Sequence, residues 1–353
     1  MISIPVTLHF KQPAGTSRGV YTTRQLWYLE HQDQPIGECA PLPALSCDDL
    51  PDYESRLSQL LAPLNAAWPT MAHQFDPTSS TPLPQLAPLQ PYPSMLFGAE
   101  TALWHLQTAG FRSGLSTPFA QGQEGIPFNG LIWMGTYDEM RERIEQKLAQ
   151  GFRCVKLKIG AINFDDELSL LKRIRRDYGP DRIELRVDAN GAFTPSEAPT
   201  RLAQLAELQL HSIEQPIRAG QWRAMAQLCA TTPLPIALDE ELIGINDWSG
   251  RERLLDAVRP QFIVLKPSLY GGISGTWQWI QAARERGIGY WLTSALESNV
   301  GLTAIAHLCA LIRQQYPDDP QLPQGLGTGQ LFTTNQPSRL ELRGDEMWWN
   351  ICQ

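Results

Sequence analysis

The sequence predicts an α/β protein in which a closed barrel of parallel strands follows a small α+β unit. Short apolar runs alternate with amphipathic helical segments from residue 126 onward, and this alternation is typical of a parallel sheet with crossover helices. A strand, a helix and two loops together take about 30 residues, and a barrel carries its active site at the carboxyl ends of its strands. Charged residues end five of the apolar runs at intervals of 30, 26, 25 and 27 residues, and they are Lys158, Asp188, Glu214, Asp239 and Lys266.

The first 115 residues are expected to form the α+β unit, with strands before helices. A stretch rich in Gly, Thr and Ser at 12–22 predicts a flexible loop. Six prolines within 77–94 predict a loop or linker that is not the interior of a helix or strand. The predicted strands are 2–10 and 25–30, and the predicted helices lie within 45–64 and at 94–110.

Residues 116–329 are expected to form the barrel, because seven or eight strand–helix units favour a closed barrel over an open sheet. The glycine-rich segment 325–330 predicts a tight turn after the last barrel strand. The tail from about residue 330 is expected to add a strand outside the barrel and to return to the N-terminal unit. The predicted barrel strands are 126–133, 154–160, 184–191, 211–217, 235–240, 262–268 and 289–297, with helices at 136–152, 164–179 and 195–210 and further helical segments between the later strands.

Composition and charge narrow the classes of function. With 42% hydrophobic and 19% charged residues, the chain of 353 residues can bury a large core. The net charge is −8, and no basic stretch is interleaved with aromatic residues, which argues against nucleic acid and against an anionic membrane as partners. The negative net charge does not exclude a small-molecule carboxylate as substrate, because a binding site can be locally positive.

The cysteines and the N-terminus predict a cytoplasmic protein. None of the six cysteines forms a C-x-x-C pair, and scattered thiols in a chain of this length are typical of a reducing compartment. The N-terminus lacks the basic and apolar regions of a signal peptide, and no apolar stretch approaches the roughly 20 residues that span a bilayer.

The three carboxylates predict a metal site. Asp188, Glu214 and Asp239 converge from three adjacent strands and repel one another unless a cation neutralises them. Their oxygens are hard ligands, and no His or Cys stands at an equivalent strand end. These observations favour Mg²⁺, with Mn²⁺ as a substitute, over zinc. Side-chain alternation predicts that Glu240 points away from Asp239, toward solvent or a supporting position.

The two strand-end lysines predict removal of a proton next to a carboxylate. A C–H group next to a carboxylate is a very weak acid. Loss of its proton gives an enediolate, and a metal can stabilise the negative charge that develops on it. A lysine beside the metal can act as the base in its neutral form. Because side chains alternate along a strand, Lys156 points in the same direction as Lys158 and is placed to favour that neutral form.

The pattern of Lys156, Lys158, Asp188, Glu214 and Asp239 resembles the active site of the enolase superfamily, in the branch with a K-x-K base motif on the second barrel strand. The stretches HFKQPAGTSRGVY, GECAPLP, TSALESNVGL and GLGTGQLF add to this likeness, which covers the whole chain. The resemblance implies a modified TIM barrel, (β/α)7β, with an N-terminal α+β capping domain. It also implies that the three carboxylates ligate Mg²⁺.

The same resemblance implies a syn dehydration of a hydroxycyclohexadiene carboxylate to an aromatic acid. Lys158 would remove the proton next to the ring carboxylate and then protonate the departing hydroxyl. Lys266 would stabilise the enediolate from the opposite face. The loop at 15–20 resembles the loop that closes over the substrate. The implied substrate contacts are Lys156, which also supports Lys158, and Arg186, Asn190, Ser294, Ser298 and Gly327.

Two other functions stay open at this point. The same metal and lysines suit racemisation or epimerisation of an N-acylamino acid or dipeptide, or a cycloisomerisation. Dipeptide epimerases carry an acidic motif near the last barrel strands for the substrate ammonium, whereas here Glu297 stands alone without a D-x-D, which favours dehydration. A barrel kept as a non-catalytic binding module is the second alternative, and the five intact charged residues argue against it.

Overall fold

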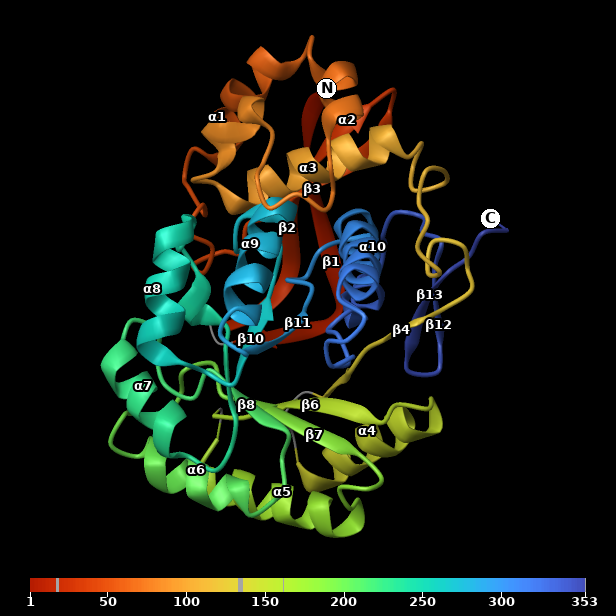
Figure 1. Ribbon diagram of the computed structural model, residues 1–353. Helices are drawn as coiled ribbons and strands as arrows, with labels where there is room; N and C mark the ends of the chain where they lie inside the picture. Colours follow the sequence, from red (N-terminus) through yellow and green to blue (C-terminus); the bar gives the residue numbers. More distant parts are fainter. Residues whose placement is uncertain (17–18, 133–135, 161, 353) are drawn as a thin grey trace.

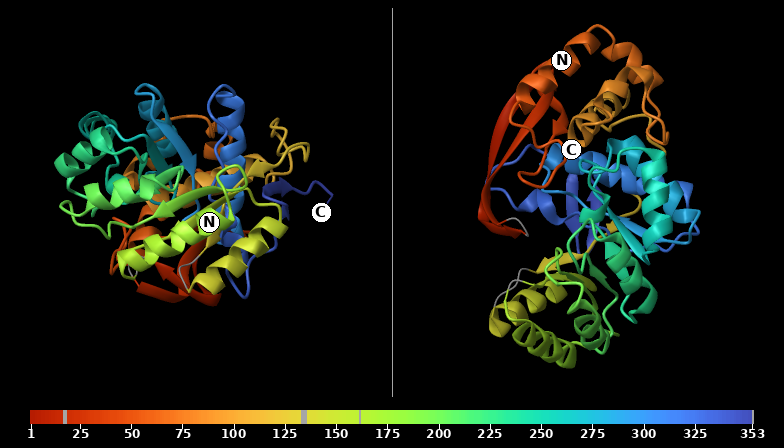
Figure 2. Two further views of the ribbon diagram at one scale, coloured as in Figure 1. Left: turned by 90° about the horizontal axis from the view of Figure 1, so that it is seen from below. Right: turned by 90° about the vertical axis from the view of Figure 1, so that its left-hand side faces the viewer.

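The computed structural model describes residues 1–16, 19–132, 136–160 and 162–352. Figure 1 shows the N-terminal strands and helices at the top and the parallel strands with their helices below them. In the right-hand view of Figure 2 the N-terminal unit sits on one end of the barrel. Within the described ranges, no helix has both the length and the apolar character that crossing a membrane demands.

The N-terminal unit is an antiparallel sheet of order β1-β2-β3 covered by helices. Two glycines allow α3 to approach β3 closely, since a Cβ on Gly37 would lie 2.3 Å from the carbonyl oxygen of Gly98. The elements are β1 (Ile2–Thr16), β2 (Gly19–His31), β3 (Gln34–Cys39), α1 (Tyr53–Leu61), η1 (Ala62–Leu64), α2 (Trp68–Gln74), η2 (Pro84–Leu89) and α3 (Pro93–Gln107).

Two loop predictions in this unit are wrong in part. The predicted loop at 12–22 is mostly strand, because β1 and β2 continue to pair as far as Thr16 and Gly19 after a register shift between His9 and Ala14. The proline-rich segment contains the 3₁₀ helix η2, with Pro88 inside it. Pro84 begins this helix, at a position where its missing N–H is not needed.

The barrel is confirmed as a (β/α)7β arrangement. Seven parallel strands run in the order β5 to β11, and isolated parallel bridges at Gln324 and Gly325 join β11 back to Phe128 just before β5. The elements are β5 (Gly130–Ile132), α4 (Tyr137–Ala149), β6 (Cys154–Lys158), α5 (Phe164–Asp177), β7 (Glu184–Asp188), α6 (Ala198–Ala206), β8 (Ser212–Glu214), α7 (Trp222–Thr231), β9 (Ile236–Leu238), η3 (Glu240–Leu242), α8 (Trp248–Val258), β10 (Phe262–Leu265), α9 (Gly272–Arg284), β11 (Gly289–Leu292), α10 (Asn299–Gln315) and η4 (Gly327–Gln330).

The first predicted barrel strand, 126–133, is divided between two sheets. Its beginning forms β4 (Ile126–Pro127), which pairs with β13 of a C-terminal hairpin, and only its later part, β5, belongs to the barrel. The hairpin consists of β12 (Leu340–Arg343) and β13 (Glu346–Trp349). Before this hairpin, Phe332 bridges to Phe10 of β1, so the tail contacts both units of the molecule.

One hydrophobic core runs through both units, from Leu57 on α1 to Trp349 on β13. Buried carboxylates of the N-terminal unit also accept hydrogen bonds from the starts of barrel helices. Glu38 accepts from the backbone N–H groups of Ser298 and Gly301 at the start of α10. A helix start leaves such donors unsatisfied, so these contacts hold the two units together. The domain limits near residues 115 and 329 stay predictions.

Candidate active site

Three of the spaced residues stand in register at the carboxyl ends of neighbouring strands. Lys158 on β6 is the pairing partner of Asp188 on β7, and Asp188 is in turn the partner of Glu214 on β8. Asp239 directly follows β9, and Lys266 directly follows β10. All five therefore lie at the same end of the barrel, as their spacing in the sequence predicts.

Ammonium groups lie between the carboxylates. The Nζ atom of Lys158 is 2.5 Å from Oδ2 of Asp188, and Nζ of Lys156 lies 3.4 Å from the same oxygen and 2.9 Å from Oε2 of Glu214. On the other side of the site, Lys266 donates a hydrogen bond to Asp239. Lys156 and Lys158 thus share one carboxylate oxygen, and a change in one alters the surroundings of the other.

Burial and ion pairing act in opposite directions on these groups. Burial would raise the pKa of Asp188, but the ammonium groups of Lys158 and Lys156 outweigh it and hold that pKa below its usual range. Burial and the negative charge of Asp188 raise the pKa of Glu214 to about 8. Burial would lower the pKa of Lys266, but neighbouring carboxylates, above all Asp239, raise it instead. Lys266 is therefore held as an ammonium ion.

The donor set fits a hard divalent cation. Four buried carboxylates, Asp188, Glu214, Asp239 and Glu240, face three lysines, and Oε1 of Glu214 has no hydrogen-bond partner among the described residues. Buried carboxyl groups that crowd together and offer only oxygen donors form the environment that Mg²⁺ prefers. Within the described ranges no three such side chains already surround one point, because the carboxylates turn toward lysines. Binding of a cation therefore requires the ammonium groups to turn away from these oxygens.

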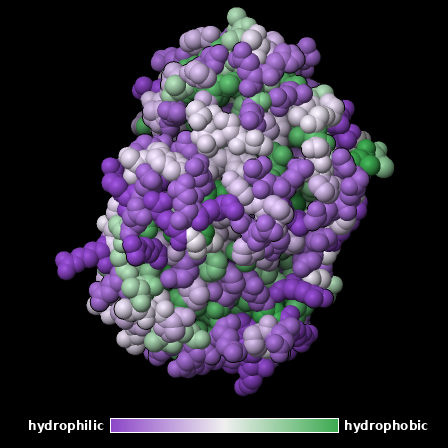
Figure 3. Space-filling model, viewed as in Figure 1, coloured by the Kyte–Doolittle hydropathy of each residue, from purple (hydrophilic) through white to green (hydrophobic). Residues whose placement is uncertain are grey.

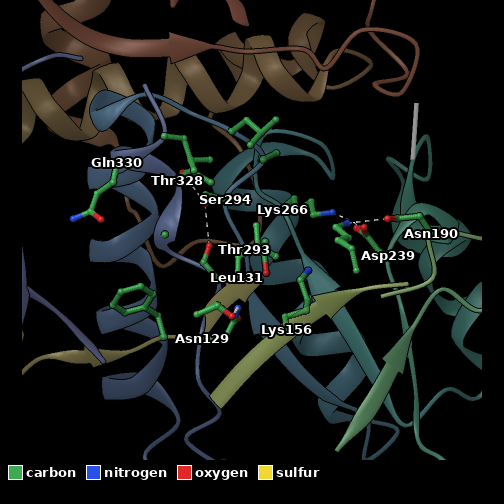
Figure 4. A pocket seen from close by; sticks show the side chains of 18 of the residues that line it. Asn129, Leu131, Lys156, Asn190, Asp239, Lys266, Thr293, Ser294, Thr328 and Gln330 are labelled. Carbon is green, nitrogen blue, oxygen red and sulfur yellow. Dashed lines mark hydrogen bonds and ion pairs between the residues drawn. The ribbon is translucent and has the colours of Figure 1, made fainter. Parts of the chain in front are cut away.

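A cavity of about 340 Å³ opens beside this cluster (Figure 4), and its size is that of a small-molecule site. Leu42 and Leu45 of the N-terminal unit contribute to its wall, so the site lies between the two units. Lys158 has the most exposed of the three lysine side chains, at 23%. Seven of the predicted site residues line the cavity, and they are Lys156, Lys158, Asn190, Asp239, Lys266, Ser294 and Gly327.

The wall of the cavity away from the cluster carries hydroxyl groups and no carboxylate among the described residues. In Figure 4, Thr293, Ser294 and Thr328 lie on this side. The hydroxyl of Thr328 donates to that of Ser294 at 2.9 Å, and Ser294 donates to the carbonyl of Gly325 at 2.9 Å. Glu297 is fully buried away from the cavity, where it accepts hydrogen bonds from Ser268 and from the backbone of Ala295. It is therefore not placed to bind a substrate ammonium.

Two predicted substrate contacts lie outside the cavity lining. Arg186 stands two positions before Asp188, which places it about 7 Å deeper in the barrel. There its Nε donates to Glu184 at 2.8 Å, and its guanidinium lies 4.5 Å from the ring centroid of Trp291. Ser298 caps α10 and donates its hydroxyl to Glu38 at 2.5 Å. Both side chains contact other parts of the protein in the described structure, and neither residue lines the cavity.

Alternation along the chain predicts that Glu240 points away from Asp239, yet Glu240 also lines the cavity. The strand β9 ends at Leu238, and Glu240 begins a 3₁₀ turn in which alternation no longer applies. Its Oε1 accepts from Asn190, whose own Oδ1 accepts from Lys158 at 2.8 Å. Glu240 thus positions the Asn190 amide, which in turn accepts a hydrogen bond from the predicted base, Lys158.

Tyr270 is another residue of the site that the sequence does not single out. Its hydroxyl donates to the side chain and the backbone carbonyl of Asp239. It stands four residues after Lys266, beyond the end of β10, so strand periodicity gives no signal for it. The predicted substrate loop at 15–20 includes residues 17 and 18, which lie outside the described ranges.

Comparison with known proteins places this geometry in a family. A family model described as enolase C-terminal domain-like matches residues 139–338. The chain is 47% identical to an o-succinylbenzoate synthase of Desulfotalea psychrophila, over 96% of this chain and 95% of that protein. It is 24% identical to the L-Ala-D/L-Glu epimerase of Bacillus subtilis, over 88% of this chain and 82% of that protein.

Solved structures agree with these matches. The crystal structure of MenC from Desulfotalea psychrophila superposes with a TM-score of 0.83 at 43% identity and covers 98% of both chains. A muconate lactonizing enzyme from Pseudomonas fluorescens has a TM-score of 0.78 at 21% identity, over 98% of this chain and 92% of that one. At this lower identity the likeness concerns the fold alone.

Proposed function

The chain belongs to the enolase superfamily, and from this membership we propose that it is an o-succinylbenzoate synthase. The enzyme is a hydro-lyase that converts 2-succinyl-6-hydroxy-2,4-cyclohexadiene-1-carboxylate into 2-succinylbenzoate and water in the biosynthesis of menaquinone or phylloquinone. The observation that carries this choice of substrate is the 47% identity to a synthase of that name across nearly the whole chain.

Lys158 serves as the base in this proposal. Its Nζ takes the proton from the ring carbon that bears the carboxylate, and the same group then gives the proton to the hydroxyl that leaves as water. The carbon–oxygen bond breaks, the ring becomes aromatic, and no electron donor or acceptor is needed. Lys158 is suited to this task because it reaches the cavity and is oriented by Asp188 and Asn190. General base catalysis of this kind contributes about 10²- to 10⁴-fold.

Lys266 acts on the other side of the substrate as a fixed positive charge. Its ion pair with Asp239 keeps it protonated, so it stabilises the enediolate and does not compete for the proton. Lys156 has a raised pKa, because Glu214 and Asp188 outweigh the effect of burial. It therefore adds a second positive charge close to Lys158.

Asp188, Glu214 and Asp239 would hold Mg²⁺, or Mn²⁺ in its place. A dipeptide epimerase from Enterococcus faecalis with the same fold has been solved in complex with Mg. The metal supplies positive charge to the carboxylate oxygens of the substrate as the enediolate forms. The oxygen-only donor set supports this assignment, and so does the oxygen of Glu214 that has no hydrogen-bond partner among the described residues.

The cavity supports a dehydratase more than a dipeptide epimerase. A dipeptide carries an ammonium group that needs an acceptor, and the hydroxyl-lined wall around Ser294 and Thr328 supplies no carboxylate among the described residues. A succinyl chain needs hydrogen-bond donors instead, which the hydroxyl groups of Ser294 and Thr328 can provide when they turn from their present acceptors. The six cysteines are all unpaired, which supports the further proposal that the enzyme works in the cytoplasm.

An ultraviolet assay of the purified protein with Mg²⁺ tests the proposed function. The cyclohexadiene substrate is followed for formation of the aromatic product, and N-succinylamino acids are followed in parallel for racemisation. We expect turnover of the cyclohexadiene to exceed racemisation by several orders of magnitude in kcat/KM. Rapid racemisation without dehydration would show that the protein is a racemase of the same superfamily.

A further inference from the structure

A second cavity lies on the outside of the molecule, where the N-terminal unit meets the C-terminal tail. Its volume is about 340 Å³, the same as that of the active-site cavity. It is walled by the end of α3, the start of β3, the first turns of α10, residues 336–339 and Trp349 of β13. Figure 1 shows α3, α10 and β13 near one another at this place. Every residue that lines it belongs to the described ranges.

The ionisable residues of this second cavity are basic. Arg112 and Arg339 line it together with His105, and no Asp or Glu is among the described lining residues. Neither guanidinium forms an ion pair or a side-chain hydrogen bond with another residue in the described part of the chain. Arg339 lies 5.9 Å from the ring centroid of Trp349. Two unpaired guanidinium groups in one cavity are notable in a chain whose net charge is −8.

The remaining wall combines apolar surface with neutral polar groups. Ile36, Phe111 and Trp349 supply buried apolar area, and Asn299 and Ser338 supply polar side chains. His105 lies against Phe111 with ring centroids 5.9 Å apart, and burial, followed by the charge of Arg112, lowers its pKa to about 4. At neutral pH the charge of the cavity is therefore that of its two arginines.

The segment 330–339 joins this second cavity to the active site. Gln330 and Leu331 line the active-site cavity at one end of the segment, whereas Arg339 lines the second cavity at the other. Between them, the side chain of Asn335 accepts from the backbone of Asn299 at 2.9 Å and donates to the carbonyl of Gly329 at 3.0 Å. The middle of the segment is thus tied to the start of α10 and to η4.

We propose that the second cavity is a binding site for a small organic anion with one or more carboxylate groups on an aromatic or other apolar body. Arg112 and Arg339 would bind the carboxylates, since guanidinium groups match their geometry in pairs of hydrogen bonds. Phe111 and Trp349 would contact the apolar body. The proposal concerns binding at this place and does not depend on which reaction the active site performs.

The test compares wild-type protein with the double variant Arg112→Gln/Arg339→Gln by isothermal titration with phthalate. Divalent metal is removed from the protein beforehand on a chelating resin, so that phthalate cannot bind to a metal in the active site. We expect phthalate to bind wild type, and the double variant to bind it at least about tenfold more weakly, which is the loss of roughly one charge-assisted contact. The matched control is Arg223→Gln on α7, which is exposed and forms no ion pair in the described structure and should bind as wild type does.

Two further measurements keep the result interpretable. The kcat/KM of the double variant should equal that of wild type, which shows that the protein is folded and that the active site is intact. Inorganic phosphate should bind at least about tenfold more weakly than phthalate, because it lacks an apolar body. Equal phthalate affinity in wild type and double variant, or no binding to wild type, would overturn the proposal. Equal affinity for phosphate and phthalate would overturn the assigned ligand class.

Discussion

Lys158 and Asp188 occupy paired positions on adjacent parallel strands, and the Nζ of the lysine lies 2.5 Å from Oδ2 of the aspartate. The backbone ladder between β6 and β7 therefore places the proposed base and a proposed metal ligand side by side, while the lysine side chain can still turn when a cation binds. Burial would raise the pKa of Asp188, but the nearby ammonium groups of Lys158 and Lys156 lower it. The positions of Lys158 and Asp188 are thus set by strand register and not by the conformation of a loop.

Replacement of Lys158 by alanine should abolish dehydration while the protein stays folded. We expect kcat to fall by about 10³-fold or more, because removal of a general base costs about 10²- to 10⁴-fold and the same group also protonates the leaving hydroxyl. The ultraviolet assay measures the rate, and circular dichroism checks the fold. Lys172→Ala, an exposed lysine on α5, is the control and should keep full activity. A Lys158→Ala enzyme with more than a tenth of wild-type kcat would rule out this role.

Removal of divalent metal should stop the reaction reversibly. EDTA should reduce activity to background, and Mg²⁺ or Mn²⁺ should restore it, whereas Zn²⁺ should restore it poorly because all the ligands are hard oxygens. Glu214→Gln should weaken Mg²⁺ binding by about 10-fold or more in a titration calorimeter, since it removes one charged ligand. Asp165→Asn at the exposed start of α5 is the matched control. Full activity in EDTA would refute a metal-dependent mechanism.

The spacing of the charged residues predicts the site because the site depends only on where the parallel strands end. Parallel strands of a barrel place their carboxyl ends at the same edge, so Lys158, Asp188 and Glu214 meet whatever the loops between them do. The same reasoning covers Asp239 and Lys266, which directly follow their strands. Loop lengths and helix ends did not have to be known for this prediction.

The errors arise where regular periodicity ends. Alternation fails for Glu240 because the chain has already left β9. Arg186 shares a strand face with Asp188, but depth along the barrel axis decides which residue meets the cavity, and alternation does not report depth. Composition predicts a loop at 12–22, whereas pairing between β1 and β2 extends both strands into this segment.

Arg186 should matter for stability more than for substrate binding. Its side chain is 1% exposed and pairs with Glu184 beneath Trp291, so Arg186→Ala leaves a partly buried carboxylate without its partner. We expect the free energy of unfolding in urea to fall by about 2–4 kcal/mol, while KM for the cyclohexadiene changes by less than about threefold. Arg223→Ala on the surface of α7 is the control for loss of an arginine. A tenfold rise in KM at unchanged stability would mean that Arg186 contacts the substrate after all.

The pH dependence of stability should reflect the carboxylates buried at the junction of the two units. Glu100 on α3 accepts hydrogen bonds from the backbone N–H groups of Ile273 and Ser274 at the start of α9, and burial raises its pKa to about 7. A carboxyl group whose pKa is higher in the folded state than in the unfolded state binds protons more tightly when folded. The free energy of unfolding should therefore fall as pH rises from about 4.5 to about 7, by at most about 3 kcal/mol for this group.

Glu100→Gln isolates this contribution because the amide cannot titrate. The decrease in the free energy of unfolding between about pH 4.5 and about pH 8, measured by urea denaturation, should be smaller in this variant than in wild type by up to about 3 kcal/mol. Glu54→Gln, at an exposed position of α1, should show the wild-type dependence. Any constant loss of stability from the new amide affects both pH values equally and cancels in the difference. If Glu100→Gln and wild type lose the same stability over this range, Glu100 is ionised in the folded protein throughout, and the junction carries a buried negative charge.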